Sequence, residues 1–177
     1  MGWTGYEASY FKPNGDIDRK AEIKAHYEKN FEILKDSLVG STYYGAFRER
    51  TDDRVFAVVI HTSVRNGYFY YKTITEDEGP NSFDCPKSIF KLLSPARCEW
   101  SREWREKCEA KRESKNTLKN LPVGSVIKIN VFNGTRILTK RAPAYQFKTC
   151  WWETDRGTYY SKKYIPNNYE ILSKGGN

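Results

Sequence analysis

Hydrophobic and polar residues alternate along residues 126–131, and this pattern predicts a strand with one buried face. Ile127, Ile129 and Val131 fall on one side of such a strand, and the residues between them fall on the other. Asn133-Gly134 follows and is typical of the tight turn of a β-hairpin. The chain is therefore expected to return as a second strand directly after this turn.

Further short segments continue this pattern toward the C-terminus. Strands are expected at residues 135–140, 146–153 and 158–163. Residues 165–172 then supply apolar side chains suited to sealing a small core. Four or five short strands within about 55 residues favour a small closed or half-closed barrel, which we expect to be SH3-like.

The N-terminal part of the chain predicts an α+β layer built on an antiparallel sheet. Residues 3–11 are rich in aromatic side chains, which favours a strand. Residues 19–37 carry apolar side chains at spacings of four, four and three, which predicts one amphipathic helix, capped by Asp16 or Asp18. A meander of strands is expected at residues 42–50, 54–64 and 68–75, with a central strand covered on both faces.

Two helices are expected to follow this meander. A short one covers residues 86–93, and a longer one begins at Ser94-Pro95. Trp100, Trp104 and Cys108 are expected to form the buried edge of the longer helix, whose other positions alternate in charge sign.

These elements indicate two domains. The first, residues 1–114, is an α+β domain that ends in a charged helix. Residues 114–120 are the expected joint. The second, residues 115–177, is a small basic barrel rich in aromatic residues.

The net charge of the chain is concentrated in its last third. The whole chain carries a net charge of +8, from 30 Lys/Arg and 22 Asp/Glu. Residues 115–177 contain 11 Lys/Arg and three Asp/Glu, so residues 1–114 are neutral. Basic and aromatic residues together on a small barrel favour phosphate contacts and stacking on bases. The alternative is that the aromatic residues form the core and the lysines only solvate the surface.

The candidate nucleic-acid-binding residues all lie in this basic segment. For phosphate contacts we expect Lys128, Arg136, Lys140, Arg141, Lys148, Lys162 and Lys163. For stacking we expect Trp151 or Trp152, and Tyr160 is a further candidate. Adjacent residues of a strand face opposite sides, so only one of the two tryptophans should be exposed.

No catalytic or metal site emerges from the sequence. The four cysteines form no C-x-x-C pair, and with two histidines they do not indicate a zinc site. We expect all four to be reduced thiols. The sequence around His26 and His61 does not indicate a carboxylate that would orient either histidine as the base of a catalytic nucleophile. No phosphate-binding glycine motif is present. We therefore expect a non-catalytic protein without a cofactor.

The remaining sequence features are an acidic loop and the lack of membrane or secretion signals. The acidic loop at residues 76–81 lacks the spacing of a calcium loop and is expected to be solvated. No window reaches the length of a membrane span, and the N-terminus lacks the apolar run of a signal peptide. These observations predict a cytoplasmic protein that does not bind membranes.

Several motifs resemble a family of small proteins encoded by phages and mobile elements of Firmicutes. Near the N-terminus they are Gly2-Trp3-Thr4, Tyr10-Phe11-Lys12 and the run from Gly15 to Glu22. The others are Leu38 to Gly45, Asp84 to Ile89, Glu103-Trp104-Arg105, Leu121 to Ile127, Pro143 to Lys148 and Ile165 to Glu170. The chain departs from this family at Gly5-Tyr6-Glu7, where a Tyr-His pair is expected.

This resemblance carries a functional implication. Proteins of this size and origin include anti-CRISPR inhibitors of Cas9, and the sequence is similar to members of that group. The resemblance implies an inhibitor that binds Cas9 or the Cas9–guide RNA complex in the bacterial host cell, and the basic segment adds contact with double-stranded DNA. Three alternatives remain: a phage DNA-binding accessory protein with no Cas9 target, a module that binds only protein, and an enzyme centred on His61 and Cys85.

Overall fold

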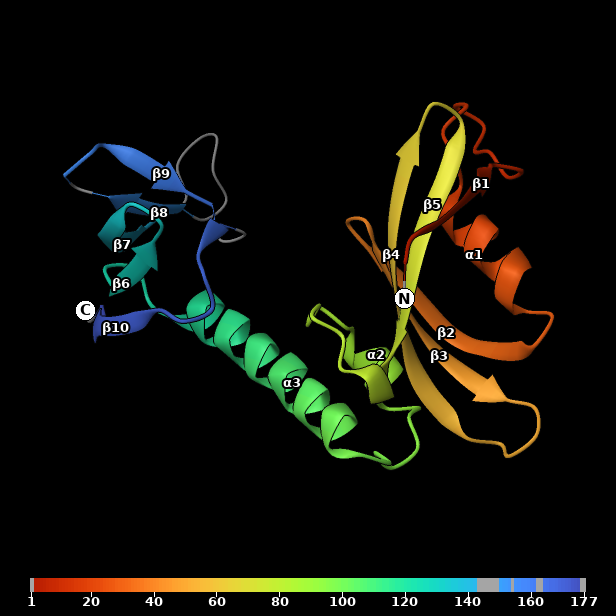
Figure 1. Cartoon of the computed structure of the whole chain (residues 1–177). Helices are drawn as coiled ribbons and strands as arrows, with labels where there is room; N and C mark the ends of the chain where they lie inside the picture. Colours follow the sequence, from red (N-terminus) through yellow and green to blue (C-terminus); the bar gives the residue numbers. More distant parts are fainter. Residues whose placement is uncertain (1, 143–149, 154, 162–163, 176–177) are drawn as a thin grey trace. The chain divides into compact units, whose positions relative to one another are not determined.

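The computed structural model describes residues 2–142, 150–153, 155–161 and 164–175 of the chain. The chain divides into two compact units, Met1–Cys108 and Glu109–Asn177, called here the N-terminal and C-terminal units (Figure 1). Each unit contains one five-stranded antiparallel sheet, and helices accompany the first of them, so the fold is α+β as predicted. The division falls a few residues before the boundary expected after residue 114.

The N-terminal sheet is a four-stranded meander with one additional edge strand. Its strands are β1 (Thr4–Glu7), β2 (Phe31–Val39), β3 (Thr42–Glu49), β4 (Val55–Arg65) and β5 (Tyr68–Thr75), in the order β1-β5-β4-β3-β2. The predicted turn between β4 and β5 is confirmed, because Asn66 and Gly67 adopt φ angles of 49° and 81°. Residues 55–60 of β4 are buried, and the two faces of this central strand contribute to two different cores.

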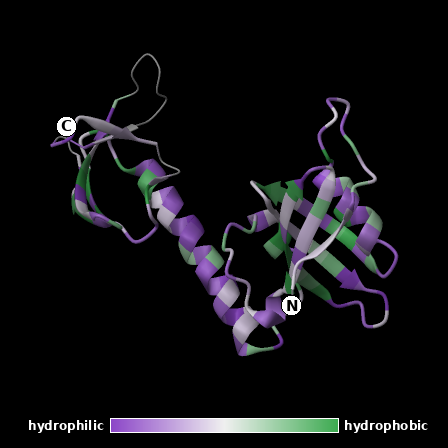
Figure 2. Cartoon of the chain, turned by 45° about the horizontal axis from the view of Figure 1, so that its top comes forward, coloured by the Kyte–Doolittle hydropathy of each residue, from purple (hydrophilic) through white to green (hydrophobic). Residues whose placement is uncertain are grey.

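Both faces of this sheet are packed against helices. On one face, helix α1 (Arg19–Tyr27) inserts Ile23 against a core that contains Tyr43 and Phe47. On the other, α2 (Lys87–Phe90) and the beginning of α3 (Glu99–Asn120) cover part of β3 and β4. Figure 2 shows the apolar residues on these strands, whereas α3 is mostly hydrophilic along its length.

The predicted helix over residues 19–37 is wrong beyond Tyr27, since Phe31–Val39 forms strand β2. β2 pairs with β3 along its length, with a register shift between Ile33 and Lys35. Ile33 packs against the α1-side core and Leu34 against the opposite core, as adjacent strand residues do, and the bulge returns Leu38 to the α1 side. β2 is therefore packed on both faces, and the spacing of three residues between Phe31 and Leu34, which contact different cores, resembled one face of a helix.

Helix α1 begins at the second of the two predicted caps. The Asp18 carboxylate accepts hydrogen bonds from the backbone N–H groups of Lys20 and Ala21, at 3.0 and 3.1 Å. The buried carboxylate of Glu22 accepts two more from the backbone of Ser9 and Tyr10, at 2.5 and 2.7 Å. Glu22 thereby attaches the segment between β1 and α1 to the helix.

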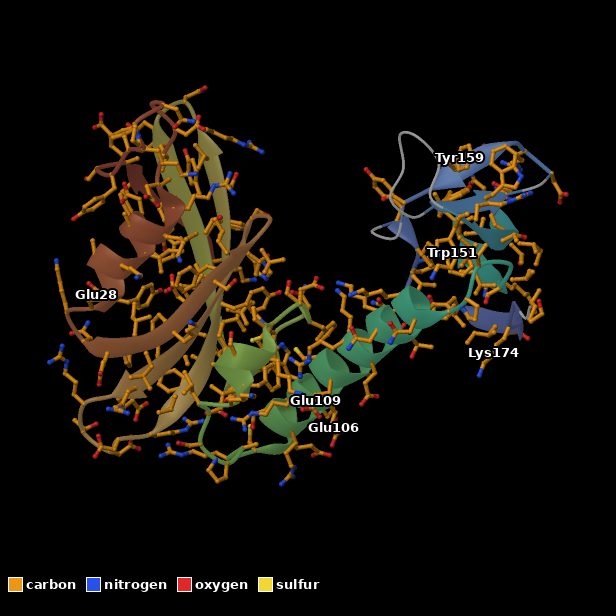
Figure 3. The ribbon with its side chains drawn as sticks, turned by 180° about the vertical axis from the view of Figure 1, so that it is seen from behind. Glu28, Glu106, Glu109, Trp151, Tyr159 and Lys174 are labelled. Atoms are coloured by element: carbon orange, nitrogen blue, oxygen red, sulfur yellow. The ribbon has the colours of Figure 1, made fainter. Side chains whose placement is uncertain are left out.

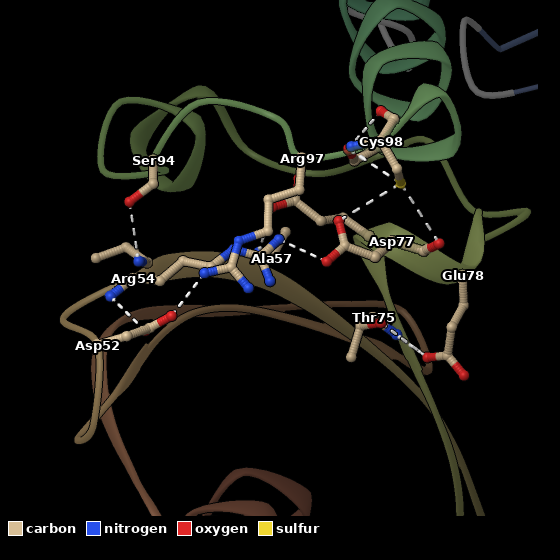
Figure 4. Close-up of polar contacts among 12 residues, drawn as sticks. Asp52, Arg54, Ala57, Thr75, Asp77, Glu78, Ser94, Arg97 and Cys98 are labelled. Atoms are coloured by element: carbon tan, nitrogen blue, oxygen red, sulfur yellow. Dashed lines mark hydrogen bonds and ion pairs between the residues drawn. The ribbon is translucent and has the colours of Figure 1, made fainter.

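A polar network attaches the connection between α2 and α3 to the sheet (Figure 4). The Ser94 hydroxyl accepts from the Val55 N–H at 3.0 Å, and the Ser94 N–H donates to the Val55 carbonyl at 2.9 Å. Arg97 pairs with Asp52 at 2.6 Å. The pKa of the Asp52 carboxyl lies below its usual value, because the backbone N–H of Arg54 and the Arg97 side chain both donate to it.

The acidic segment after β5 is not the solvated loop expected from sequence. Glu76 to Glu78 form a short 3₁₀ turn, and the side chain of Glu76 is fully buried. The Arg105 guanidinium donates two hydrogen bonds of 2.7 Å to this carboxylate. The backbone N–H of Ala57 donates a third at 3.3 Å. The arginine lies far away in sequence, so the local pattern of acids gave no sign of the pair.

Helix α3 differs from its prediction at both ends. It begins at Glu99 rather than at Ser94, and residues 114–120 continue it instead of forming an irregular joint. Trp104 and Cys108 are buried as predicted, but Trp100 is 64% exposed. Ser101 is buried in its place, because the spacing of three and four from Ser101 through Trp104 to Cys108 follows the 3.6-residue helical repeat more closely.

The C-terminal sheet packs one face on a small core. Its strands are β6 (Val126–Val131), β7 (Gly134–Arg141), β8 (Cys150–Glu153), β9 (Thr158–Tyr160) and β10 (Glu170–Ser173), in the order β10-β6-β7-β8-β9. Leu118 and Leu121, at the end of α3, pack with Ile127 and Leu138 in this core. Within the described residues β9 and β10 remain edge strands, so a closed SH3-like barrel is not shown.

Candidate nucleic-acid interface

The alternation of side chains along the C-terminal strands separates the predicted nucleic-acid-binding residues into two groups. Four lie on the inner side of the sheet, which faces the core: Arg136, Lys140, Trp151 and Tyr160. Three lie on the opposite side, called here the outer face: Lys128, Arg141 and Trp152. Lys148, Lys162 and Lys163 fall outside the described residues.

Lys140 is a structural residue and not the surface phosphate ligand that the sequence suggested. It is only 6% exposed, and its Nζ donates to the backbone carbonyls of Lys119 and Leu121 at 2.8 and 2.5 Å. These carbonyls lie at the end of α3, where a cation is favourable because helix C-termini present unsatisfied acceptors. Burial lowers the pKa of the Lys140 ammonium, while the two acceptors work in the opposite direction by stabilising its charged form.

Arg136 is neutralised inside the unit. Its Nε lies 3.2 Å from Oε1 of Glu153, and both side chains are almost completely buried. The Tyr160 hydroxyl donates to the other carboxylate oxygen of Glu153 at 2.9 Å, and this bond raises the pKa of Tyr160. Arg136 and Tyr160 therefore both bind a buried carboxylate within the unit and are not directed toward a nucleic acid.

The prediction that only one of the adjacent tryptophans is exposed is confirmed. Trp151 is 2% exposed and belongs to the core, whereas Trp152 lies partly exposed on the outer face. The Trp152 ring packs on Tyr159 of β9, with ring centroids 4.5 Å apart. Figure 3 labels Trp151 and Tyr159. Tyr159 is 47% exposed and was missed from sequence, because only the pairing of β8 with β9 places it beside Trp152.

The outer face combines an apolar centre with cations at its margins. Trp152 and Tyr159 lie in one cross-strand row, and the exposed Ile137 lies beside Lys128 in the next. Lys128 forms only a solvent-exposed pair with Glu170, at 3.2 Å. Arg141 is exposed at the end of β7. A surface of this kind can contact phosphates at its margins while its aromatic centre stacks on a base.

The charge of the C-terminal unit is consistent with an anionic partner. Residues 109–177 contain 13 Lys/Arg and five Asp/Glu, which is a net charge of +8. Two of these cations, Arg136 and Lys140, are used internally. The excess of positive charge that reaches solvent is therefore smaller than the sequence count, but it keeps the same sign.

The residues that sequence analysis considered for metal binding or catalysis are placed apart in the described part of the chain. No group of three or more His, Cys, Asp or Glu that could hold a metal ion occurs among them. Cys85, Cys98 and Cys108 form no disulfide among the described residues, and Cys85 is 1% exposed. His61 contacts the Thr42 hydroxyl at 3.3 Å. The same part of the chain contains no helix with the length and apolar character needed to cross a bilayer.

Comparisons of the chain with protein-family models, with curated proteins and with solved structures found no match.

Proposed function

We propose that the chain is a non-catalytic nucleic-acid-binding protein whose C-terminal unit contacts the phosphate backbone through its outer face. The observation that carries this proposal is the concentration of the net charge of +8 in residues 109–177, together with the exposed Arg141 and the partly exposed Lys128 on the same face as Trp152 and Tyr159. Duplex DNA attracts such a surface because each neutralised phosphate releases bound counterions.

The strand order supports a finer proposal about the C-terminal fold. In the order β10-β6-β7-β8-β9, the last strand in sequence lies beside the first. We infer that this sheet curls toward an SH3-like barrel, because closing it requires only that the edge strands β9 and β10 approach each other. The inner core of Ile127, Leu138 and Trp151 would fill such a barrel.

Within nucleic-acid binding, we propose a narrower function as an inhibitor of Cas9 encoded by a phage or mobile element. Its support is the resemblance of the motifs described above, and the basic unit is suited to contact the nucleic acid that Cas9 holds rather than the positively charged channel itself. The alternative is a phage DNA-binding accessory protein with no Cas9 target. The same charge supports both, so only an experiment with Cas9 separates them.

The test of nucleic-acid binding compares two charge reversals in the full-length chain. Arg141→Glu places an acid on the outer face, and Lys29→Glu makes the same change of charge at the turn between α1 and β2. We expect Arg141→Glu to weaken binding to a duplex of about 20 base pairs by roughly tenfold and to reduce the salt slope by about 1. Equal affinities of the two variants would contradict the proposal.

The test of Cas9 inhibition uses three baits, duplex DNA, Cas9 alone and the Cas9–guide RNA complex, with target cleavage as a second readout. Retention on the complex together with reduced cleavage would support the inhibitor. Retention on duplex DNA with undiminished cleavage would leave the accessory DNA-binding protein. Failure to bind any of the three baits would overturn both.

A further inference from the structure

A second surface with aromatic and cationic side chains lies on the N-terminal sheet. It is formed by the half of the sheet where β1, β5 and the end of β4 are adjacent, on the side opposite α1. The strand register places its members in cross-strand rows: Gly5 with Tyr70 and Ser63, Glu7 with Tyr68 and Arg65, and Lys72 with His61. Trp3 precedes Gly5 by two residues and so continues this side along β1.

This surface, called here the aromatic face, is not covered by the helices that pack on the same side of the sheet. The core under α2 and α3 involves β4 residues from Val55 to Val59, whereas the aromatic face begins at His61. Trp3 is 56% exposed and Tyr68 is 45% exposed. A group of large aromatic side chains exposed together on a sheet face is typical of an interaction site or a ligand-binding groove.

The aromatic residues surround a shallow cavity. Trp3, Ser63, Arg65 and Tyr70 line a space of about 460 Å³. The Tyr70 ring occupies the space above Gly5, since a Cβ atom at Gly5 would lie 2.4 Å from the ring. The absence of a side chain at Gly5 therefore lets Tyr70 lie over the backbone of β1. The Tyr68 and Tyr70 ring centroids are 6.3 Å apart, at an interplanar angle of 31°.

The cations of the aromatic face are available to a ligand. Arg65 and Lys72 make no ion pair or side-chain hydrogen bond with any residue that the structure describes. Glu7 is the acid in the same rows, and it is separated from Arg65 by Tyr68. The face therefore has a local excess of positive charge, although residues 1–108 carry 17 Lys/Arg and 17 Asp/Glu and are neutral as a whole.

We propose that the aromatic face binds unpaired nucleotides of a single-stranded nucleic acid. Trp3 and Tyr70 stack on bases across the cavity, and Arg65 and Lys72 contact the phosphates that link them. A duplex hides the faces of its bases, whereas a single strand offers a π-face at each nucleotide together with one negative charge. A ligand with both properties uses the exposed rings and the unpaired cations at the same time.

This site is separate from the outer face proposed above, because all its residues belong to the N-terminal unit. The experiment uses the full-length chain with a fluorescent oligodeoxythymidine of about ten nucleotides, which is within the site size of a small single-strand-binding surface. Anisotropy gives its affinity, and the duplex of the earlier test is measured in parallel.

The matched variants are Trp3→Ala and Trp100→Ala. Both remove an exposed tryptophan from the N-terminal unit, but Trp100 lies on α3 and outside the aromatic face. We expect Trp3→Ala to weaken oligonucleotide binding by roughly fivefold to a hundredfold, because stacking on one base is worth about 1–3 kcal/mol. Trp100→Ala should leave it unchanged, and neither variant should alter duplex affinity. Arg65→Ala and Lys72→Ala should each reduce the salt slope for the oligonucleotide by about 0.7.

Photochemical crosslinking with a 4-thiothymidine oligonucleotide locates the bound strand independently of affinity. Crosslinks to peptides that contain Trp3 or Tyr70 would support the proposal. Crosslinks confined to the C-terminal unit, or equal oligonucleotide affinities for Trp3→Ala and Trp100→Ala, would overturn it. Loss of retention on Cas9 by Trp3→Ala, without any oligonucleotide binding by the unsubstituted chain, would instead identify the aromatic face as a protein-docking surface and would also overturn it.

Discussion

The two units are built on similar sheets but expose their charges in opposite ways. In the C-terminal unit the sequence has a large excess of cations. Two of them have internal partners, however: Arg136 pairs with a buried carboxylate, and Lys140 donates to carbonyls at the end of a helix. In the N-terminal unit the two signs are equal in number, yet Arg65 and Lys72 on the aromatic face have no ion-pair partner among the residues that the structure describes. The charge that a partner meets is therefore set by which side chains are paired in the fold and not by the count in the sequence.

The largest expected effect concerns the buried ion pair of the N-terminal unit. Arg105→Met leaves the fully buried Glu76 carboxylate without its partner, and we expect a loss of about 3–5 kcal/mol in the free energy of unfolding. Lys107→Met removes an exposed pair with Glu103 and should cost less than about 0.5 kcal/mol. Urea unfolding measures both variants, and equal midpoints would contradict the importance of burial.

A comparable loss is expected from the core of the C-terminal unit. Trp151→Ala removes a buried ring and should cost about 3–5 kcal/mol, whereas Trp152→Ala removes a partly exposed one and should cost less than half as much. Hydrogen exchange read by mass spectrometry would assign the lost protection to strands β6 to β8. If Trp152→Ala proved the more damaging change, the assignment of the inner and outer faces would be wrong.

A smaller effect separates structural from available cations. Lys140→Met leaves the carbonyls of Lys119 and Leu121 without their donor and should cost about 1–3 kcal/mol. Because Lys140 is buried, the same change should not alter duplex affinity, in contrast to Arg141→Glu. Lys174→Met, at an exposed position, serves as the stability control and should change the free energy of unfolding by less than about 0.5 kcal/mol. A fall in duplex affinity for Lys140→Met, in a variant that remains folded, would place Lys140 in the interface.

Much of the secondary structure could be predicted from local pattern and turn chemistry. The meander of β3, β4 and β5, the turn at Asn66-Gly67 and the cap at Asp18 follow from residues that are neighbours in sequence. The prediction failed at β2, where Phe31 and Leu34 contact different cores although their spacing in sequence resembles one face of a helix. It also failed at Glu76, whose partner Arg105 comes from a distant helix.

The candidate site was predicted less well because accessibility depends on strand register. Period-two alternation alone required one of Trp151 and Trp152 to be exposed, but only packing against Leu118 and Ile165 identified which one. Alternation also placed Arg136 and Lys140 on the same side as the buried Leu138. The prediction of phosphate ligands counted charges and did not take this side of the strand into account. The aromatic face had no sequence signal, since its members come from separate strands of a neutral segment.

The sequence by itself determined the α+β class, most of the strands and the unit that carries the net charge, because these depend on residue type and on short-range periodicity. Only the tertiary structure decided which cations are buried, which aromatic residues reach solvent and where unpaired charge gathers. Those properties depend on pairing between strands and on contacts between distant residues. A buried cation needs its partners close by, whereas a cation with no nearby acid remains free for a ligand.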